Sequence, residues 1–322
     1  MLTYFSISAA ACRNFCYKVL KRIELLSRHG KAGGPLASDE PLLYVSSDFF
    51  KRDMGWQMGA VDFARFVDEL AQASGDAILP FFRTHLGTED KSRGGVFDPV
   101  TEADKAAEII MRRMIEDAFP AHGIIGEEFG NKNETADYVW VLDPIDGTKS
   151  FISGMPVWGS LIGLQHKGRP CYGMMHQPFT RERFSGDGQG ALWRGFDRHG
   201  KTTERALRTR ACDKLSKATL MTTHPSLLGG DTREPYERVE KQVRLSRYGG
   251  DCYAYCMVAA GQIDLVIESG LKPYDIVALI PIIEGAGGII TNWQGESAAS
   301  GGAIIAAGDK RVHEEALRSL NA

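Results

Sequence analysis

The sequence has no uninterrupted apolar run that approaches the roughly 18 residues of a membrane-spanning helix. It has no strong excess of one charge either, because 38 Lys and Arg residues stand against 41 Asp and Glu residues. Internal repeats and low-complexity tracts are also missing. We therefore expect neither a membrane nor a nucleic-acid partner, and a small-molecule function is the default for a globular chain of this composition.

Cysteine is scarce and is not spaced for a metal or disulfide framework. The six cysteines form no Cys-x-x-Cys pair and show no Cys/His ligand spacing. A chain of 322 residues needs no covalent cross-link to hold a core. We expect reduced thiols in a cytoplasmic protein, with Cys252 and Cys256 buried.

The first 57 residues differ in charge from the remainder. They carry eight Lys or Arg residues against five acids, whereas the rest of the chain has more acids than bases. A basic, acid-poor start is faintly similar to an organellar presequence, but we prefer upstream translation before a start at Met54 or Met58. No positively charged region precedes the first apolar stretch, so we do not expect secretion. Residues 1–57 are expected to be a poorly structured extension.

Two helices and a series of strands are predicted after this extension. Apolar residues recur every three or four positions from Val61, which predicts a helix that Pro80 kinks or ends. A second helix is expected to follow Thr101 and to stop at Pro120. On its inner side we place Ala106, Ile109, Ile110, Met114 and Ala118. The β-rich runs expected as strands are Ile124-Ile125, Tyr138 to Leu142, Val157 to Leu164, Cys171 to Gln177 and Ala191 to Trp193.

A polar, basic stretch at residues 197–217 marks a change of pattern. Strands and helices then alternate: strand Ala218 to Thr222, helix from Asp251, strand Asp264 to Glu268, helix from Asp275, strands Gly288 to Thr291 and Ala303 to Ala306, and a final helix from about Lys310. We predict an α/β protein with an α+β half at residues 58–210 and an α/β half at residues 211–322.

The most informative stretch is the octapeptide VLDPIDGT, in which an apolar strand ends in two carboxylates three residues apart. Asp143, Asp146 and the carbonyl of Ile145 offer the oxygen ligands that Mg²⁺ prefers. Gly147 allows close backbone approach, and the amides of Gly147 and Thr148 suit an anion. Metal and phosphate would then meet at one place. The alternative is a tight Asp-Pro turn with Asp146 as a helix N-cap.

Three further acidic positions lie at the edges of apolar elements. Glu127 and Glu128 directly follow an apolar strand, and one of them could bridge two metal ions. Asp104 stands at the start of the second helix, where the alternative is a Thr-x-x-Asp capping box. Asp275 opens a helix after a proline, and its alternative role is an N-cap. Four such positions favour a shared site over four unrelated caps.

These residues resemble the inositol monophosphatase family of Mg²⁺-dependent phosphomonoesterases. The resemblance covers essentially all of residues 58–322 and rests on four segments in the family's order: Asp98–Asp104, Gly126–Glu128, Asp143–Thr148 and Tyr274–Ala278. It implies a layered αβαβα sandwich with the site between the two halves, often as a homodimer. Tyr274 stands where the family usually has tryptophan, which leaves the neighbouring carboxylate in place.

The resemblance also implies the roles of the site residues. Two Mg²⁺ ions would be held by Glu127, Asp143 and the Ile145 carbonyl, and by Asp143, Asp146 and Asp275. A third, weaker ion would lie near Glu127 and Asp104, with Lys91 as a neighbour unless that lysine is simply exposed. Thr148, oriented by Asp104, would position or deprotonate the attacking water, which makes Thr148, Asp104 and Glu127 the implied catalytic set. The amides of Gly147 and Thr148 would receive the phosphoryl oxygens.

Two acids in the C-terminal half indicate the leaving group. Asp251 lies where many inositol phosphatases have a small hydroxyl residue or alanine, and Glu268 stands seven residues before Asp275, at the family's substrate-contacting position. A desolvated acid pair suits a cationic alcohol better than a neutral polyol, because buried charge needs compensation. The alternatives are an N-cap role for Asp251 and a surface position for Glu268.

Three segments are similar to the histidinol-phosphate phosphatase branch of the family: Arg247–Tyr255, Gln177–Phe184 and Tyr274–Glu284. This similarity implies hydrolysis of L-histidinol phosphate to L-histidinol and phosphate in histidine biosynthesis. Two alternatives stay open, namely a phosphatase for inositol phosphates or other small phosphomonoesters, and a non-catalytic regulatory binding protein. The complete acidic set and the missing basic patch favour an enzyme.

Overall fold

The computed structural model describes the backbone of residues 60–84 and 102–322, and side chains from residue 63 onward within those ranges. The expectations for residues 1–57, for Lys91 and for residues 98–101 lie outside the described residues. Among the described helices, none is both long enough and apolar enough to cross a membrane.

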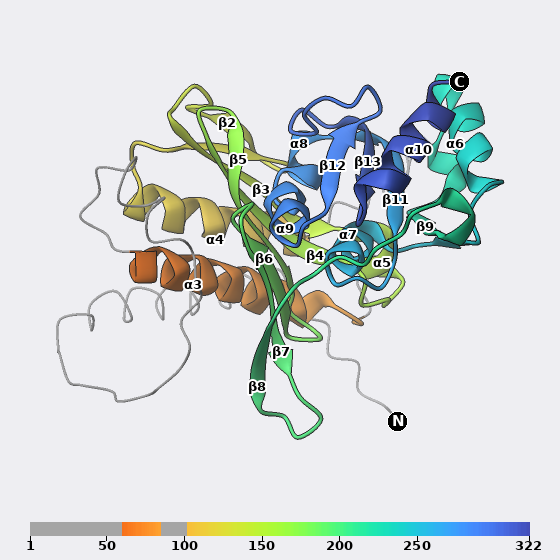
Figure 1. Cartoon of the computed structure of the whole chain (residues 1–322). Helices are drawn as coiled ribbons and strands as arrows, with labels where there is room; N and C mark the ends of the chain where they lie inside the picture. The colour runs from red at the N-terminus through yellow and green to blue at the C-terminus, as the bar shows by residue number, and fades with distance from the viewer. Residues whose placement is uncertain (1–59, 85–101) are drawn as a thin grey trace, which may run out of the picture. The chain divides into compact units, whose positions relative to one another are not determined.

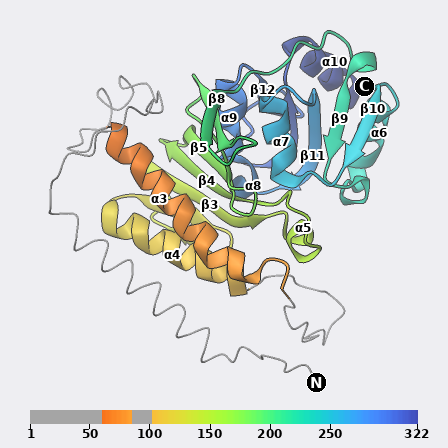
Figure 2. The same cartoon turned by 90° about the horizontal axis from the view of Figure 1, so that it is seen from below.

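Two helices lie side by side against one face of a sheet (Figure 2). Helix α3 spans Ala60–Ile78 and runs into the 3-10 turn η1, Leu79–Phe81. Pro80 lies in this turn, as expected for a residue that lacks the amide hydrogen of a helical bond. Helix α4 spans Glu102–Ala118 and ends before Pro120, as predicted.

The inner face that the sequence predicts for α4 is correct only in part. Ile110 is buried and Met114 packs against an apolar core, whereas Ile109 is 50% exposed and Ala118 is exposed. The buried residues of the helix are Ala103, Asp104, Ala107, Glu108, Ile110, Met111 and Ile115. Two acids belong to this buried face, so the apolar residues alone do not define it.

An eight-stranded sheet follows these helices in the chain. Its strands are β1 (Gly123–Gly126), β2 (Gly130–Lys132), β3 (Tyr138–Asp146), β4 (Gly159–His166), β5 (Arg169–Gln177), β6 (Glu182–Gly186), β7 (Ala191–Phe196) and β8 (Thr202–Ala206). They are arranged in the order β2-β1-β3-β4-β5-β6-β7-β8. Neighbours pair antiparallel except β1 and β3, which are parallel.

A second sheet of five strands has the order β10-β9-β11-β13-β12. Its strands are β9 (Thr219–Thr222), β10 (Leu245–Tyr248), β11 (Leu265–Leu271), β12 (Ile289–Asn292) and β13 (Gly302–Ala307). The helices of this half are α6 (Arg233–Glu240), α7 (Asp251–Ala259), α8 (Pro273–Ile276), α9 (Leu279–Gly285) and α10 (Lys310–Leu320). Strands β10, β9 and β11 run parallel, so their carboxyl ends share one edge of the sheet.

Helices and sheets alternate as layers (Figures 1 and 2). Helices α3 and α4 cover one face of the larger sheet, and α9 packs on its strands β5, β6 and β7. Helix α7 contacts α9 and the smaller sheet, while α10 contacts β13 and α6. The predicted αβαβα sandwich is therefore confirmed. Its layers are joined by large apolar cores, one of which includes Tyr255, Ile276 and Ile283.

Several elements differ from the sequence-based expectation. The helix predicted from Asp275 begins two residues earlier, at Pro273, and is divided into α8 and α9. The short helix α5 (Thr148–Ile152) and the elements α6, β2, β6, β8 and β10 are not among the predicted ones. The predicted burial of the Cys252 and Cys256 thiols is confirmed, and both cysteines are free.

Candidate active site

The irregular end of β3 orients Asp143 and Asp146, two of the expected metal ligands. The pairing of β3 with β4 shifts register between Asp143 and Asp146, on either side of Pro144. The Ser160 hydroxyl donates to the Pro144 carbonyl at 2.7 Å and holds this irregularity. In a regular strand, residues three apart point to opposite faces. The shift therefore allows both carboxylates to face the same site, as bulges next to active sites commonly do.

A buried acid holds the turn that carries Glu127 and Glu128. This turn follows β1, which runs parallel to β3, so the two strand ends meet at one edge. Glu108 on α4 accepts hydrogen bonds from the amides of Glu128, at 2.7 Å, and Phe129, at 3.2 Å. Arg112 donates to the same Glu108 carboxylate at 2.6 Å. The inner face of α4 thus fixes the backbone beside the site.

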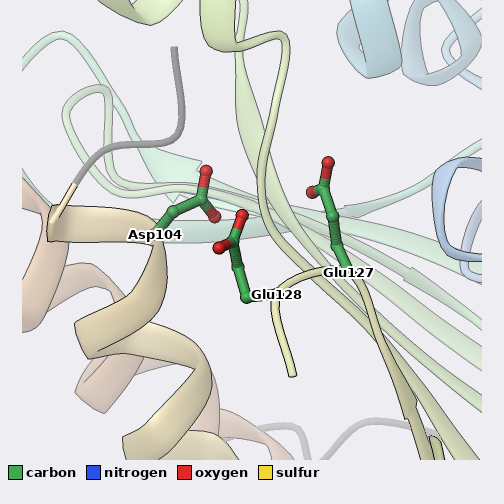
Figure 3. Close-up of side chains that lie close together, drawn as sticks. All are labelled: Asp104, Glu127 and Glu128. Carbon is green, nitrogen blue, oxygen red and sulfur yellow. The ribbon is translucent and has the colours of Figure 1, made fainter. Parts of the chain in front are cut away.

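Two groups of carboxylates come together at these strand ends. Asp104, Glu127 and Glu128 form the first, shown in Figure 3, and each offers an oxygen within 4.8 Å of the others. Asp143, Asp146 and Asp275 form the second, with the same spacing. The carboxylates of Glu127 and Asp275 lie next to that of Asp143, which joins the two groups.

Burial makes the charged forms of these carboxylates unfavourable. Burial, followed by the charges of Glu127 and Glu128, raises the pKa of Asp104 to about 8. Burial is also the largest cause that raises the pKa of Glu127 to about 7. The pKa values of Asp143 and Asp146 are raised by burial first and then by neighbouring carboxylates. So many acids in one place need positive charge for all of them to ionise.

The residues fit a divalent metal ion. Within the described part of the chain, Asp143 Oδ1 is buried and has no hydrogen-bond partner. A buried carboxylate oxygen without a partner is costly, and a cation removes that cost. The donors are all oxygens, which matches the preference of Mg²⁺. The second group, with its shared Asp143, is the ligand set that the sequence predicts for the second ion.

The backbone after β3 turns sharply at Gly147. Its φ of 86° is in the left-handed region that favours glycine, and Gly147 is the N-cap of α5. The alternative role of Asp146 as the N-cap of this helix is therefore wrong. Asp146 Oδ2 instead accepts a hydrogen bond at 2.7 Å from the amide of Cys252 in the first turn of α7. Thr148 donates its hydroxyl to the Ile145 carbonyl at 3.3 Å, and the Ile145 amide donates to Asp104.

A pocket extends from the second carboxylate group to the two acids of the C-terminal half. It is a small pocket, with a cavity volume of about 170 Å³. Its lining includes Asp146, Asp275, Asp251, Glu268, Leu227 and Leu228. The pocket opens at the carboxyl ends of the parallel strands β9, β10 and β11, where α/β sheets commonly bind ligands.

Neither Asp251 nor Glu268 has the simpler role that the sequence offered as its alternative. Gly250, and not Asp251, is the N-cap of α7. Asp251 has a φ of 41° and accepts from the Ser150 hydroxyl at 2.5 Å, so its strained backbone holds the carboxylate over α5. Glu268 is 7% exposed and is not a surface acid. Tyr255 donates to its Oε2 atom at 2.9 Å.

Sequence reasoning missed the hydroxyl groups that hold these acids. Ser150, Thr223 and Tyr255 all donate to them, and none of the three was singled out for this role. Tyr255 lies within the segment Arg247–Tyr255, four residues after Asp251, and Ser150 lies two residues beyond the segment that ends at Thr148, which is the available signal. Thr223 follows a strand without any motif, and its role becomes visible only through the sheet register.

The fold brings together two carboxylate groups that could hold a divalent metal ion, and comparisons with known proteins identify the class of enzyme as a phosphatase. The chain is 47% identical over 270 residues to "Bifunctional phosphatase IMPL2, chloroplastic" of Arabidopsis thaliana, covering 80% of this chain and 75% of that protein. It is 34% identical over 228 residues to a histidinol-phosphatase of Mycobacterium tuberculosis, covering 70% and 85%. A solved inositol monophosphatase from Zymomonas mobilis matches with a TM-score of 0.72 at 39% identity, covering 81% and 98%.

The chain belongs to the inositol monophosphatase family, whose model matches residues 61–322. It is therefore a metal-dependent phosphatase that acts on small phosphate monoesters. The expected family membership and phosphatase activity are confirmed.

Proposed function

We propose that this phosphatase hydrolyses L-histidinol phosphate to L-histidinol and phosphate, a reaction of histidine biosynthesis. The observation that carries the proposal is the pocket in which Asp251 and Glu268 lie next to Asp146 and Asp275. A monoester bound there would have its phosphate at the metal-ligand carboxylates and its alcohol between the other two acids. L-histidinol carries an amino group and an imidazole, which can supply the positive charge.

The electrostatics of the second acid pair support a cationic alcohol. Burial raises the pKa of both Asp251 and Glu268, because the charged form loses solvation. Within residues 63–84 and 102–322, no lysine or arginine forms an ion pair with Glu268. The positive charge of Lys149 opposes the effect of burial on Asp251 without cancelling it. A neutral polyol would leave Glu268 without a positive partner, whereas a substrate ammonium or imidazolium would form charge-assisted hydrogen bonds with both carboxylates.

We further propose the ligand sets for two Mg²⁺ ions that the sequence suggested, with a third near Glu127 and Asp104. The contact between Glu127 and Asp143 supports a first set with the Ile145 carbonyl, and Glu128 lies close enough to contribute. When bound, Mg²⁺ supplies positive charge to the phosphate and leaving oxygen and lowers the pKa of water. The number of ions stays a prediction.

The chain's own groups would orient the reactants. Thr148 donates its hydroxyl to the Ile145 carbonyl, and the Ile145 amide donates to Asp104, so both side chains lie beside the same residue. We propose that Thr148 positions the attacking water and that Asp104 helps to accept its proton. The amides of Gly147 and Thr148, at the turn before α5, would donate to the phosphoryl oxygens.

The relatives support the proposal and also its first alternative. Histidinol-phosphatases of Mycobacterium tuberculosis and Chlorobaculum parvum are 34% and 32% identical to this chain. An inositol monophosphatase of Solanum lycopersicum is 30% identical, which keeps an inositol phosphate or other small monoester as the alternative substrate. A regulatory binding protein is the second alternative, and the intact acidic set argues against it.

Release of inorganic phosphate tests the proposed substrate. We expect the full chain with Mg²⁺ to hydrolyse L-histidinol phosphate with a kcat/KM at least about tenfold above that for myo-inositol 1-phosphate, because one well-made charged hydrogen bond is worth that ratio. A preference for the inositol ester would overturn the substrate assignment and leave the phosphatase chemistry standing.

Three further expectations stay predictions. The boundary between halves at residues 210 and 211 falls between the last strand of the larger sheet, β8, and the first of the smaller one, β9. A homodimer and a cytoplasmic location are expected from the sequence. The name of the Arabidopsis relative places that protein in the chloroplast. The interpretation of residues 1–57 as an organellar presequence should therefore be tested beside the expected cytoplasmic location.

A further inference from the structure

The pocket beside the carboxylate groups contains one hydroxyl that contacts both of its acids. Thr223 directly follows β9, and its Oγ1 atom donates to Glu268 Oε1 at 2.5 Å. The Thr223 amide donates to the same oxygen at 2.9 Å. The Thr223 side chain also lies close enough to Asp251 to lower the pKa of that carboxyl against the effect of burial. Thr223 therefore links the two carboxylates that would face the leaving group.

The sheet register explains why Thr223 reaches both acids. Strands β9 and β11 are parallel, with Leu220 opposite Leu265. The same offset of 45 positions places Thr223 beside Glu268. The Thr223 carbonyl accepts at 2.8 Å from the amide of Gly249, in the segment that leads into α7. The backbone of Thr223 thus joins the chain segments that carry the two acids.

The hydrogen-bond count in this pocket leaves room for a charged donor. A threonine hydroxyl has one proton, so Thr223 cannot donate to both carboxylates at once. Their other donors are the hydroxyls of Ser150, on Asp251, and Tyr255, on Glu268. All of these donors are neutral and cancel no charge. The pair is held in a fixed arrangement, and a ligand that brings N–H donors and positive charge would complete it.

We propose that Thr223 is a specificity-determining positioning residue, which fixes the spacing of the Asp251 and Glu268 carboxylates and thereby favours a cationic leaving alcohol over a neutral one. This inference rests on the proposed function, because it concerns the same pocket. The phosphate would lie at Asp146 and Asp275, on the other side of the substrate. Loss of the hydroxyl should therefore change KM for the cationic substrate and leave kcat nearly unchanged.

The test uses Thr223→Val, which removes the hydroxyl at nearly constant volume, in the full chain with Mg²⁺. We expect KM for L-histidinol phosphate to rise about tenfold, as for loss of one hydrogen bond to a charged group, while KM for myo-inositol 1-phosphate changes less than about twofold. Thr223→Ser, which keeps the hydroxyl, should restore the wild-type KM. The matched control is Thr232→Val, since Thr232 bonds to Gly229 and Ser269 near the same pocket but to neither acid.

The outcomes separate this inference from the proposed function. A wild-type preference for L-histidinol phosphate that Thr223→Val leaves intact would overturn the role of Thr223 alone. Equal rises of KM for both substrates would overturn it too, because the hydroxyl would then support only the fold of the pocket. A wild-type enzyme with no preference for the cationic substrate would overturn the proposed function and this inference together.

Discussion

Asp143 is among the most enclosed acids of the protein, with 2% of its surface exposed. It contacts Glu127 and Asp275, and its Oδ1 atom has no hydrogen-bond partner among the described residues. Burial and four neighbouring carboxylates raise its pKa. In the metal-free protein the charged form of Asp143 is therefore unfavourable, and its position is explained by metal binding and not by stability.

The substitution Asp143→Asn separates these two effects. It removes a ligand that both proposed ions share, so we expect kcat/KM to fall at least about a hundredfold. It also removes a repelled negative charge, so the free energy of unfolding without metal should rise by about 1 kcal/mol. Phosphate release and urea unfolding in EDTA measure the two results. The control is Asp137→Asn, which makes the same change at an exposed site. An Asp143→Asn variant that keeps its activity and is less stable than wild type would contradict the account.

At the scale of elements, α4 holds the turn after β1. Glu108 is completely buried and accepts from two backbone amides of that turn, and Arg112 compensates its charge. The Arg112 guanidinium also bonds to the Gly130 carbonyl at the start of β2. This network fixes the direction in which Glu127 leaves the strand end, without contact to substrate.

Glu108→Gln should weaken metal binding through this network. The amide keeps the size of the side chain but accepts less strongly and loses the ion pair with Arg112. We expect the Mg²⁺ concentration for half-maximal activity to rise about tenfold, as for partners that orient metal ligands, with activity recovered at saturating Mg²⁺. Glu116→Gln, on the exposed side of the same helix, should behave like wild type. An unchanged Mg²⁺ dependence in Glu108→Gln would show that α4 does not position the ligands.

Elements with a buried, regular pattern could be predicted from the sequence, and exposed ones could not. Strand β3 is buried along nearly its whole length, so its apolar run is distinct. Strand β2 is three exposed residues, which carry no hydrophobic pattern. Helix α6 buries only Tyr236 and Val239, too few for a helical period to be recognised.

In the candidate site, too, some residues could be predicted from the sequence and others could not. The acids that we propose as metal ligands could be found because they stand in short motifs at the ends of apolar runs, as with Asp143 and Asp146. Thr223 could not be found, because Glu268 lies 45 positions away on β11 and Asp251 lies in the first turn of α7. Contacts of this kind depend on strand order and register, which a single sequence does not contain.

At the scale of the whole described structure, the site joins the two sheets. Asp143 and Asp146 belong to β3 of the larger sheet, whereas Glu268 belongs to β11 of the smaller one. The hydrogen bond from the Cys252 amide to Asp146 connects β3 with α7, a helix that packs on the smaller sheet. Metal binding should therefore stabilise both halves together.

The pH dependence of thermal stability tests this coupling. In the unfolded chain Asp104 and Glu127 ionise near pH 3.8 and 4.5, but in the metal-free fold burial raises their pKa values to about 8 and about 7. The fold retains protons that the unfolded chain has lost, so its stability falls as pH rises toward 8. The buried His122 and His313 have the opposite effect on stability below pH 6.5. Burial lowers their pKa values to about 4, so the unfolded chain binds protons that the fold does not, and stability falls as the pH is lowered.

We therefore expect Tm in EDTA to fall by a few degrees between pH 6.5 and 8, and Mg²⁺ to abolish this fall because it stabilises the ionised carboxylates. Differential scanning calorimetry measures both curves. Parallel curves with and without Mg²⁺ would mean that these carboxylates do not hold the metal.

The most direct measurement of the central claim is the ratio of kcat/KM for L-histidinol phosphate to that for myo-inositol 1-phosphate in wild type and in Asp251→Ser. The account predicts that the ratio favours L-histidinol phosphate in wild type and falls about tenfold in the variant, because a charged partner of the leaving group is lost. Asp231→Ser, at an exposed acid outside the pocket lining, serves as the control. A ratio that is unchanged by Asp251→Ser would contradict recognition of a cationic leaving group by this pocket.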